Sequence, residues 1–343
     1  MKIDFVLIWV DGSDRDWLTE KQKYEGKRSE SSAGKETDID DELNRYRDWD
    51  NLKYWFRSIE KNAPWVNKIY FVTCGQTPSW LNTGNDKLVL INHKDYMPKE
   101  YLPTFSSHPI ELNLHRISEL SEHFVYFNDD MFLTDVCEET DFFKDNLPCD
   151  LAVEEPYSFN ERDIFNDILI NNIVAINSHF DRKEALGKNR KKFYSLKDPR
   201  SFIKNASLSL LKRDDFFGFE YQHLPQAFLK SMFEKVWEEN YDWLDETCRH
   251  KFRSRDDINQ YVIKYYQYLT GNFSPYNCRK NGTAIHMDDG KESNIDYACE
   301  CIEKKKYKLL CLNDSHVNDF ENTKEKIAAA FEKVYGEKSS FER

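Results

Sequence analysis

The stretch Phe124-Val-Tyr-Phe-Asn-Asp-Asp130 places four apolar residues directly before three polar ones. A short continuous apolar run of this kind is typical of a strand with both faces buried, as in a parallel sheet. The Asn and Asp residues that follow it favour a turn. Because ligands of open parallel sheets bind beyond the carboxyl ends of the strands, this stretch predicts a central strand and, next to it, part of a binding site.

Similar segments precede it in the chain. Apolar runs at residues 3–10, 68–73 and 87–91 predict three more strands. Between the runs, residues 52–59 carry apolar side chains at helical spacing, and residues 110–120 repeat that spacing. This alternation of strands and helices predicts an α/β fold with a mostly parallel sheet covered by helices.

The remainder of the chain is richer in helical patterns. Helices are predicted at residues 160–176, 199–212, 225–245 and 256–269, followed by a strand at 307–312 and a helix at 318–335. We therefore expect a single domain over residues 1–343. Within it we expect an α/β core at residues 1–155, a mainly helical insertion at 156–270, and a returning strand and C-terminal helix at 271–343 that rejoin the sheet.

Charge and hydropathy exclude two classes of protein. With 49 basic and 61 acidic residues the chain has a net charge of −12, which excludes a general nucleic-acid binder because phosphate contacts need a positive field. The longest unbroken apolar run, Phe5–Val10, is much shorter than the about 20 residues of a membrane span. Neither a transmembrane segment nor a signal peptide is predicted, and we expect a cytoplasmic protein.

Three of the predicted strands end in acidic turns. The turns are Asp11-Gly12-Ser13-Asp14, Asn128-Asp129-Asp130 and Asn313-Asp314-Ser315-His316. At one edge of a sheet their carboxylates would lie close together, and oxygen ligands of this kind favour Mg²⁺ or Mn²⁺. Asp-Gly and Asn-Asp are also common turn formers that bond to their own backbone, so each motif taken alone is equally compatible with a structural turn.

Basic residues near predicted helix starts are candidate phosphate ligands. Arg45-Tyr-Arg47-Asp48 precedes the first predicted helix, and Arg253-Ser-Arg255 precedes a later one. Guanidinium groups and helix N-termini both favour anions, although a solvated loop or ion pairs with nearby acidic residues would explain the same patterns. His223 is either a helix cap or a candidate base. The segment His286-Met-Asp288-Asp289-Gly290 is interpreted as a turn.

Longer motifs extend these observations. A first block covers Asp4-Phe-Val-Leu-Ile-Trp-Val-Asp11-Gly-Ser-Asp14, and a second, highly specific block runs from Arg45 to Asp130 and contains Phe56-Arg-Ser-Ile-Glu-Lys-Asn-Ala-Pro-Trp65 and Leu114-His-Arg-Ile117. Shorter segments are Ser178-His-Phe180, His223-Leu-Pro225, residues 253–259 and Leu312-Asn-Asp314. The combination resembles the Stealth family, which comprises bacterial capsular and cell-wall polysaccharide phosphotransferases and the eukaryotic N-acetylglucosamine-1-phosphotransferase that marks lysosomal enzymes.

This resemblance implies a Rossmann-like, glycosyltransferase-A-like fold and an enzyme of polysaccharide synthesis. The reaction would transfer hexose-1-phosphate or N-acetylhexosamine-1-phosphate from a UDP-sugar to a glycan hydroxyl, forming a phosphodiester and releasing UMP. The partners would be a nucleotide-sugar donor and a glycan or lipid-linked glycan acceptor. Peripheral association with the inner face of the cell membrane is left open.

The resemblance also implies roles for the residues singled out above. Asp130 and Asp314 would bind Mg²⁺ or Mn²⁺. The catalytic residues would be Asp129, His223, Arg253 and Arg255, with His223 the first choice as base and the arginines holding phosphate. The nucleotide-sugar pocket would be formed by Asp11, Gly12, Ser13, Asp14, Arg47, Asp48 and Asn128.

Two other functions fit the same residues less well. A metal-dependent glycosyltransferase would use a similar pocket but attack the sugar carbon and release UDP. A non-catalytic glycan-binding protein would need no phosphate-binding arginines beside the acidic turns, so their presence favours an enzyme.

Overall fold

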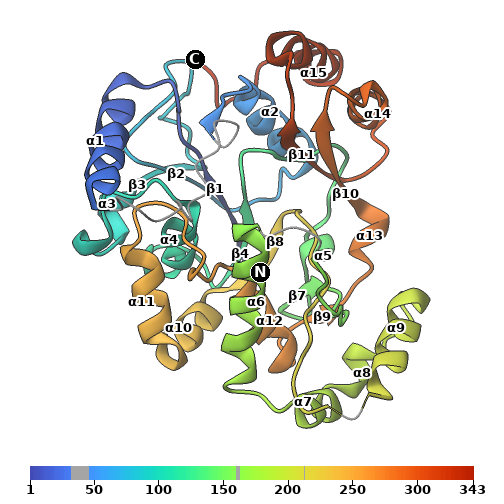
Figure 1. Ribbon diagram of the computed structural model, residues 1–343. Helices are drawn as coiled ribbons and strands as arrows, with labels where there is room; N and C mark the ends of the chain where they lie inside the picture. The colour runs from blue at the N-terminus through green and yellow to red at the C-terminus, as the bar shows by residue number, and fades with distance from the viewer. Residues whose placement is uncertain (32–45, 160–162, 212) are drawn as a thin grey trace.

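The computed structural model describes residues 1–31, 46–159, 163–211 and 213–343. Its centre is a five-stranded sheet in the order β3-β2-β1-β4-β8 (Figure 1). The strands are β1 (Ile3–Ile8), β2 (Ile69–Thr73), β3 (Leu88–Asn92), β4 (His123–Phe127) and β8 (Gln226–Leu229). The first four run parallel and β8 pairs antiparallel with β4, so the predicted α/β class with a mostly parallel sheet is confirmed.

Aromatic side chains fix the helix that packs on this sheet. All six residues of β1 are buried, as the apolar run that begins at Phe5 predicts for most of the strand, and Asp4 is buried with them. Helix α2 (Leu52–Asn62) buries Trp55 with its ring centroid 5.4 Å from that of Phe127 at the end of β4, and Phe5 lies 4.9 Å from the same ring. Such tilted and edge-on pairs each add about 0.5–1.5 kcal/mol beyond the apolar area they bury. The end of β4 is therefore held rigidly from two sides.

A second sheet of three strands has the order β10-β11-β5. Its members are β10 (Gly282–Asp288), β11 (Leu309–His316) and the short β5 (Met131–Leu133), which runs antiparallel to β11. The expectation that the last strand rejoins the main sheet is thus wrong. The expectation of a turn at residues 286–290 is wrong for residues 286–288, which form the end of strand β10. Strand β10 pairs with β11, and this long-range pairing cannot be recognised from the local sequence.

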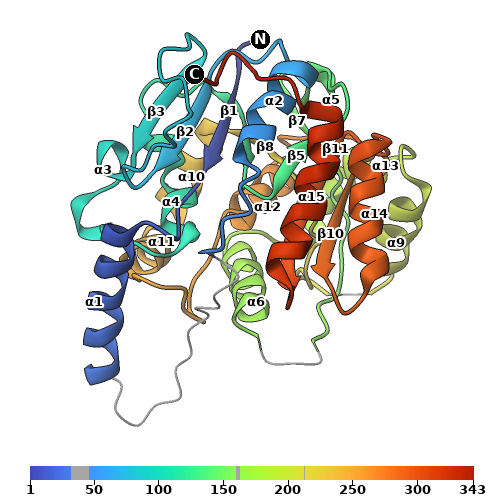
Figure 2. The same ribbon diagram turned by 90° about the horizontal axis from the view of Figure 1, so that it is seen from above.

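Two helices cover the second sheet. Helices α14 (Glu292–Glu303) and α15 (Phe320–Tyr335) lie side by side across β10 and β11 (Figure 2). The ring of Phe331 on α15 contacts that of Phe132 on β5 at 4.7 Å. The second sheet therefore has its own helical layer, while β5 connects it covalently to β4 of the first.

The chain from residue 164 to residue 269 is mainly helical. It contains α6 (Ile164–Asn177), α7 (Arg182–Lys188), α8 (Arg190–Phe193), α9 (Pro199–Ser209), α10 (Lys230–Glu239), α11 (Tyr241–Arg249) and α12 (Tyr261–Leu269). The helix predicted at 225–245 begins instead as strand β8, which pairs with β4, and it divides in two at Asn240. Residues 160–162 and 212 of two predicted helices lie outside the described residues. The proposed boundaries at 155 and 270 stay a prediction.

Short elements complete the structure. They are α1 (Arg15–Ser31), α3 (His93–Tyr96), α4 (Ser107–Leu112), α5 (Glu139–Phe142), α13 (Cys278–Asn281), the 3-10 turns η2 (Lys99–Tyr101) and η3 (Leu114–Arg116), and the strands β6 (Phe143–Lys144), β7 (Leu147–Asp150) and β9 (Ser274–Pro275). The single helix predicted over 110–120 is wrong, because α4 ends at Leu112 and a 3-10 turn follows. Among the described residues, no helix is long and apolar enough to cross a membrane.

Candidate active site

The turn at residues 128–130 joins the two sheets. The chain leaves the first sheet at Phe127, the end of β4, and enters the second at Met131, the start of β5. The backbone N–H of Met131 donates to the carbonyl of Asn128 at 3.1 Å, and the N–H of Leu312 donates to the carbonyl of Asp130 at 2.9 Å. The turn is thus tied to β11, and the predicted acidic residues lie at the junction of the sheets.

Asp130 contacts two side chains from distant parts of the sequence. Its Oδ2 lies 3.2 Å from Nε2 of His223 and accepts a hydrogen bond from Sγ of Cys311 at 3.3 Å. The amide nitrogen of Asn128 lies 3.5 Å from the same imidazole nitrogen. The other oxygen of Asp130, Oδ1, is buried and has no hydrogen-bond partner among the described residues. The arrangement therefore offers a carboxylate oxygen that a cation or substrate proton could satisfy.

Electrostatics in this cluster shift two pKa values. Burial lowers the pKa of His223, but the neighbouring Asp130 carboxylate outweighs it and raises that pKa above the usual 6.5. Loss of solvation around the carboxyl of Asp129, followed by repulsion from Asp130 and Asp48, raises its pKa to about 7, although the residue as a whole is exposed to solvent. Near neutral pH the cluster therefore exchanges protons readily.

The predicted metal ligand Asp314 is held by Arg47, a predicted phosphate-binding residue, and by Trp49, for which no role was predicted. Nη2 of Arg47 donates to Oδ1 of Asp314 at 2.8 Å, and the indole of Trp49 donates to Oδ2 at 3.2 Å. Arg47 also donates to the carbonyl of Val317 and lies over the ring of Phe320 at 4.8 Å. Burial and the nearby Asp130 raise the pKa of Asp314 despite Arg47. Arg45, which the sequence places beside Arg47, lies outside the described residues.

The first acidic turn is built as its sequence predicts. Oδ1 of Asp11 accepts from the N–H and the hydroxyl of Ser13 at 2.9 and 2.6 Å, and Asp14 accepts from the N–H of Trp17 at 2.8 Å near the start of α1. A Cβ atom on Gly12 would lie 1.9 Å from the carbonyl oxygen of Tyr46, so only glycine fits there. Asp11 is among the carboxylates that raise the pKa of Asp48, after burial and Asp50, which links this turn electrostatically to the cluster.

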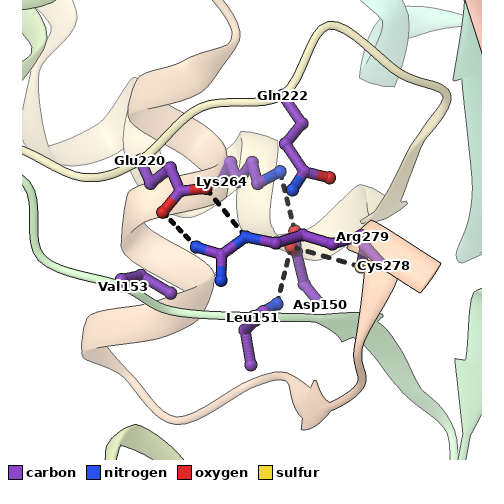
Figure 3. Close-up of a pocket in the computed structure, with 8 residues that line it drawn as sticks. All are labelled: Asp150, Leu151, Val153, Glu220, Gln222, Lys264, Cys278 and Arg279. Carbon is purple, nitrogen blue, oxygen red and sulfur yellow. Dashed lines mark hydrogen bonds and ion pairs between the residues drawn. The ribbon is translucent and has the colours of Figure 1, made fainter. Parts of the chain in front are cut away.

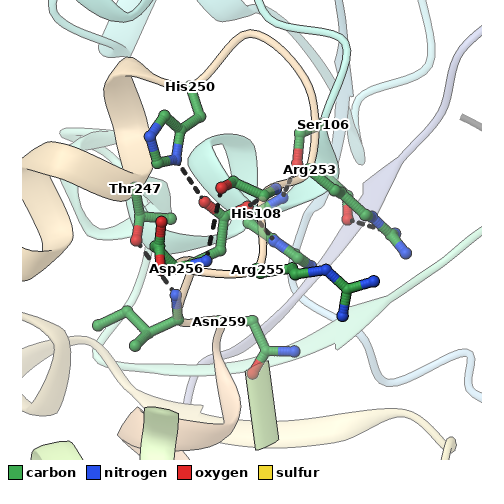
Figure 4. Close-up of polar contacts among 12 residues, drawn as sticks. Ser106, His108, Thr247, His250, Arg253, Arg255, Asp256 and Asn259 are labelled. Carbon is green, nitrogen blue, oxygen red and sulfur yellow. Dashed lines mark hydrogen bonds and ion pairs between the residues drawn. The ribbon is translucent and has the colours of Figure 1, made fainter. Parts of the chain in front are cut away.

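A buried aspartate organises the loop that carries the two later arginines, which are labelled with His108 and His250 in Figure 4. Asp257 is fully buried and lies 3.2 Å from Nδ1 of His108 and 2.6 Å from Nδ1 of His250. Burial raises the pKa of Asp257, but these imidazole contacts outweigh it and lower that pKa below 3.8. Hydrogen bonding to Asp257 raises the pKa of His250. On this loop, Arg253 donates to the hydroxyl of Ser107 at 3.2 Å.

The structure brings most of the predicted residues together. Direct contacts join Asp130 to His223 and Arg47 to Asp314, and electrostatic interactions connect Asp129 with Asp48 and Asp130. Arg255 instead forms an ion pair with Asp167 of α6, which is far away in the sequence, whereas the structural alternative named the acidic residues next to it. The catalytic and binding roles themselves stay predictions.

Two buried residues that contact the turn region, Glu111 and Cys311, were not identified from the sequence. The hydroxyl of Tyr126 donates to Oε1 of Glu111 at 2.8 Å and also contacts Oδ1 of Asn128, while Oε2 of Glu111 is buried without a hydrogen-bond partner among the described residues. The detectable signal is a charged residue, Glu111, next to the apolar residues of a short buried helix. Cys311 carries no such signal, because its contact with Asp130 depends on the pairing of β11 with β5.

A separate hollow contains none of the predicted residues (Figure 3). Its charged groups satisfy one another. Lys264 lies 3.0 Å from Asp150, and Arg279 pairs with Glu220 and, at 2.7 Å, with Asp198. We therefore interpret this hollow as a structural ion-pair network and not as a binding site.

Fold and site together define an α/β protein with a carboxylate, imidazole and guanidinium cluster at the carboxyl end of a parallel strand. Comparison of the sequence with known protein families supports this interpretation. The family description Stealth protein conserved region 1 matches residues 1–29, and Stealth protein conserved region 2 matches residues 45–149. The chain belongs to the Stealth family, as the sequence motifs predict.

Relatives match over nearly the whole chain. The capsular polysaccharide phosphotransferase WcwK of Streptococcus pneumoniae is 40% identical over 346 residues, which cover 100% of this chain and 98% of that protein. The receptor polysaccharide phosphotransferase WefC of Streptococcus oralis is 39% identical over 345 residues and 99% of each chain. The exopolysaccharide phosphotransferase cps2G of Lactiplantibacillus plantarum is 38% identical over 99% of this chain and 96% of its own. These names support the predicted transferase class.

Solved structures show only a distant likeness. The galactosyltransferase LgtC, in complex with donor and acceptor sugar analogs, aligns over 95% of both chains with a TM-score of 0.39 and 10% identity. The glycosyltransferase GlyE of Streptococcus pneumoniae covers 100% of this chain and 65% of its own, with a TM-score of 0.38 and 8% identity. Likeness at this level does not indicate a shared activity.

The Asp257 contacts predict a defined stability profile. Asp257→Asn removes the buried charge, and we expect a loss of about 3 kcal/mol in the free energy of unfolding at neutral pH. The lowered pKa of Asp257 gives stability that is present above pH 3.8 and lost as the pH falls, while the raised pKa of His250 gives stability that is present below pH 6.5 and lost as the pH rises through that raised value. The loss of stability in Asp257→Asn should therefore be largest between pH 3.8 and pH 6.5, where both contributions are present.

Urea unfolding at several pH values measures this profile. The matched control is Asp256→Asn, which removes an exposed carboxylate next in sequence and should change stability little. Equal losses in the two variants, or a loss from Asp257→Asn that grows below pH 3.8, would contradict this account of the loop.

Proposed function

We propose that this protein transfers sugar-1-phosphate from a UDP-sugar to a glycan hydroxyl, forming a phosphodiester and releasing UMP, in the synthesis of a capsular or cell-wall polysaccharide. The observation that carries the proposal is the contact of 3.2 Å between Asp130 and His223 at the carboxyl end of β4. It combines an acidic turn suited to a metal with an imidazole suited to proton transfer. Membership of a family whose relatives are named polysaccharide phosphotransferases supports the same reaction.

In the proposed reaction an acceptor hydroxyl oxygen attacks the phosphorus nearer the sugar. A new oxygen–phosphorus bond forms, and the bond from this phosphorus to the oxygen that bridges to UMP breaks. UMP leaves with that electron pair, and the hydroxyl proton passes to the protein. The sugar keeps its bond to the phosphate, which distinguishes this reaction from glycosyl transfer.

We assign the proton to His223. Nε2 of its ring lies closer to the carboxylate of Asp130, at 3.2 Å, than to the amide nitrogen of Asn128, at 3.5 Å, so we assign the hydrogen of the neutral imidazole to Nε2 and the lone pair to Nδ1. Nδ1 is then the accepting atom, and Asp130 orients the ring and stabilises the imidazolium that forms, as a carboxylate does in a catalytic triad. Asp129, with a pKa of about 7, is the nearest alternative proton acceptor.

The donors of the cluster fit a divalent cation. Oδ1 of Asp130 is a buried carboxylate oxygen with no hydrogen-bond partner among the described residues, and Asp130 interacts electrostatically with the carboxylate of Asp314. We propose that Asp130 holds Mg²⁺ or Mn²⁺ with Asp314 as second ligand, in which case Asp314 shares its carboxylate with Arg47 and Trp49. A bound cation would neutralise charge that develops on phosphate oxygens.

Arginines and the first turn complete the proposed pocket. Arg253 is the preferred phosphate ligand, because its charge acts on the imidazole of His223, whereas Arg255 forms an ion pair with Asp167. We propose that the nucleotide-sugar pocket is formed by Asp11, Gly12, Ser13, Asp14, Arg47, Asp48 and Asn128. The electrostatic interactions of Asp11 with Asp48 and of Asp48 with Asp129 support a single pocket, because the interaction between two charges weakens with distance.

The nucleotide released tests the proposed reaction. Purified protein is incubated with a panel of UDP-hexoses and UDP-N-acetylhexosamines, with Mg²⁺ or with EDTA, and UMP and UDP are separated and quantified. We expect UMP in the presence of Mg²⁺ and none with EDTA, even where water replaces the acceptor. Release of UDP would instead identify a glycosyltransferase, and absence of both products together with absence of nucleotide-sugar binding would favour a non-catalytic protein.

His223→Asn tests the base. Removal of a general base lowers the rate by about 10²–10⁴-fold, and we expect a loss in this range. Because the base must be neutral and its pKa lies above 6.5, kcat/KM of the wild type should rise as the pH increases through that raised value, and the variant should lack this rise. The matched control is His123→Asn, at the opposite end of β4, which should keep both rate and profile. A His223→Asn protein with an unchanged pH profile would exclude His223 as the base.

A further inference from the structure

One surface differs in charge from the rest of this acidic chain. Residues 188–204 contain seven basic residues and one acidic residue, a net charge of +6 in a chain of −12. The acidic residue, Asp198, is buried, caps α9 and pairs with Arg279, so it faces the interior. Arg190, Lys191 and Arg200 are exposed and form no ion pair with any described residue. Their charge is therefore available to an external partner.

The same surface exposes large apolar side chains. Leu196, Ile203 and Leu210 are 75%, 63% and 80% exposed, far more than aliphatic side chains in a protein interior. We name these three residues, together with Arg190, Lys191 and Arg200, the α8–α9 surface. Both helices lie at the periphery of the molecule, away from the five-stranded sheet (Figure 1).

The orientation of α9 explains this exposure. Its inner face is fixed by Asn205, which donates to the carbonyls of Ala152 and Phe193 at 2.9 and 2.7 Å and accepts from the N–H of Glu154. At 3.6 residues per turn, Ile203 lies about 200° around the helix from Asn205 and therefore points outward. Ile203 is therefore held outward by the packing of the helix itself and cannot turn inward without breaking these hydrogen bonds, whereas Leu196 precedes α9 and Leu210 follows it.

We propose that the α8–α9 surface docks the protein on a membrane that contains anionic phospholipids. Basic side chains beside exposed aliphatic ones are the combination that interfacial protein segments use, with the charges at the headgroups and the aliphatic groups at the acyl boundary. Charge complementarity selects an anionic partner, and it disfavours a symmetric contact between the α8–α9 surfaces of two copies because both carry positive charge. The inference is independent of the proposed reaction, since docking requires no turnover.

The expected strength follows from the charges. Each Lys or Arg near an anionic leaflet strengthens binding about five-fold, so three together contribute about a hundred-fold. The remainder of the chain is acidic and repelled by the same lipids, which orients the protein with the α8–α9 surface toward the membrane. The attraction extends only over a Debye length, about 10 Å at 0.1 M salt, and should therefore be lost at high salt.

Co-sedimentation of the full chain with lipid vesicles tests the proposal. The vesicles contain either phosphatidylcholine alone or equal parts of phosphatidylcholine and phosphatidylglycerol. We expect binding to the anionic vesicles only, and release when salt is raised to about 1 M. The variant R190Q/K191Q/R200Q, which loses the basic side chains, should bind about a hundred-fold more weakly. The variant L196S/I203S/L210S, which loses the apolar side chains, should bind at least about ten-fold more weakly.

The matched control is K94Q/K99Q/K144Q, which removes three exposed lysines outside the α8–α9 surface and should bind like the wild type. Thermal unfolding of every variant verifies that it is folded, as expected for exposed positions, and nucleotide release from the donor is followed separately. If the wild type fails to bind anionic vesicles, the proposal is overturned. This is the result expected if the partner of the α8–α9 surface is a protein and not a membrane. Unchanged binding of either α8–α9 variant, or an equal loss in the control, also overturns it.

Discussion

The turn at residues 128–130 has to satisfy two sheets at once. It ends β4 beneath the aromatic rings of Phe5 and Trp55, and it starts β5, which pairs with β11. The turn contains only three residues between the end of β4 and the start of β5. Its backbone therefore has little conformational freedom, and Asp129 and Asp130 lie where the two sheets meet. The rest of the site is arranged around these two carboxylates.

Two neighbouring carboxylates in a crowded position repel each other, so the surrounding groups must supply protons or positive charge. The structure provides both. His223 lies against Asp130, Arg47 lies against Asp314, and the pKa of Asp129 is raised to about 7. A substrate that brings a phosphate-bound cation would relieve the same repulsion, which connects the fold of the turn to the proposed transfer of a phosphorylated sugar.

Strands of the main sheet could be predicted because their sequences are mostly apolar. Strands β1, β2 and β4 are buried almost throughout, whereas β3 lies at the edge of the sheet and buries only Leu88. Strand β8 could not, since Gln226–Leu229 is short and its strand conformation depends on pairing with β4. The acidic turns and His223 could be found from local sequence. The proximity of Glu111 and Cys311 could not, because it arises from contacts between segments that are far apart in the chain.

The central claim is that the oxygen nucleophile attacks the phosphorus nearer the sugar. Slow hydrolysis of the UDP-sugar by the purified protein in water enriched in the heavy oxygen isotope tests it most directly, because no acceptor needs to be known. Mass spectrometry then locates the label. We predict that the heavy oxygen enters the sugar-1-phosphate and that the UMP is unlabelled. Heavy oxygen in UMP would place the attack at the other phosphorus, and heavy oxygen in free sugar would place it at carbon; either result would contradict the account.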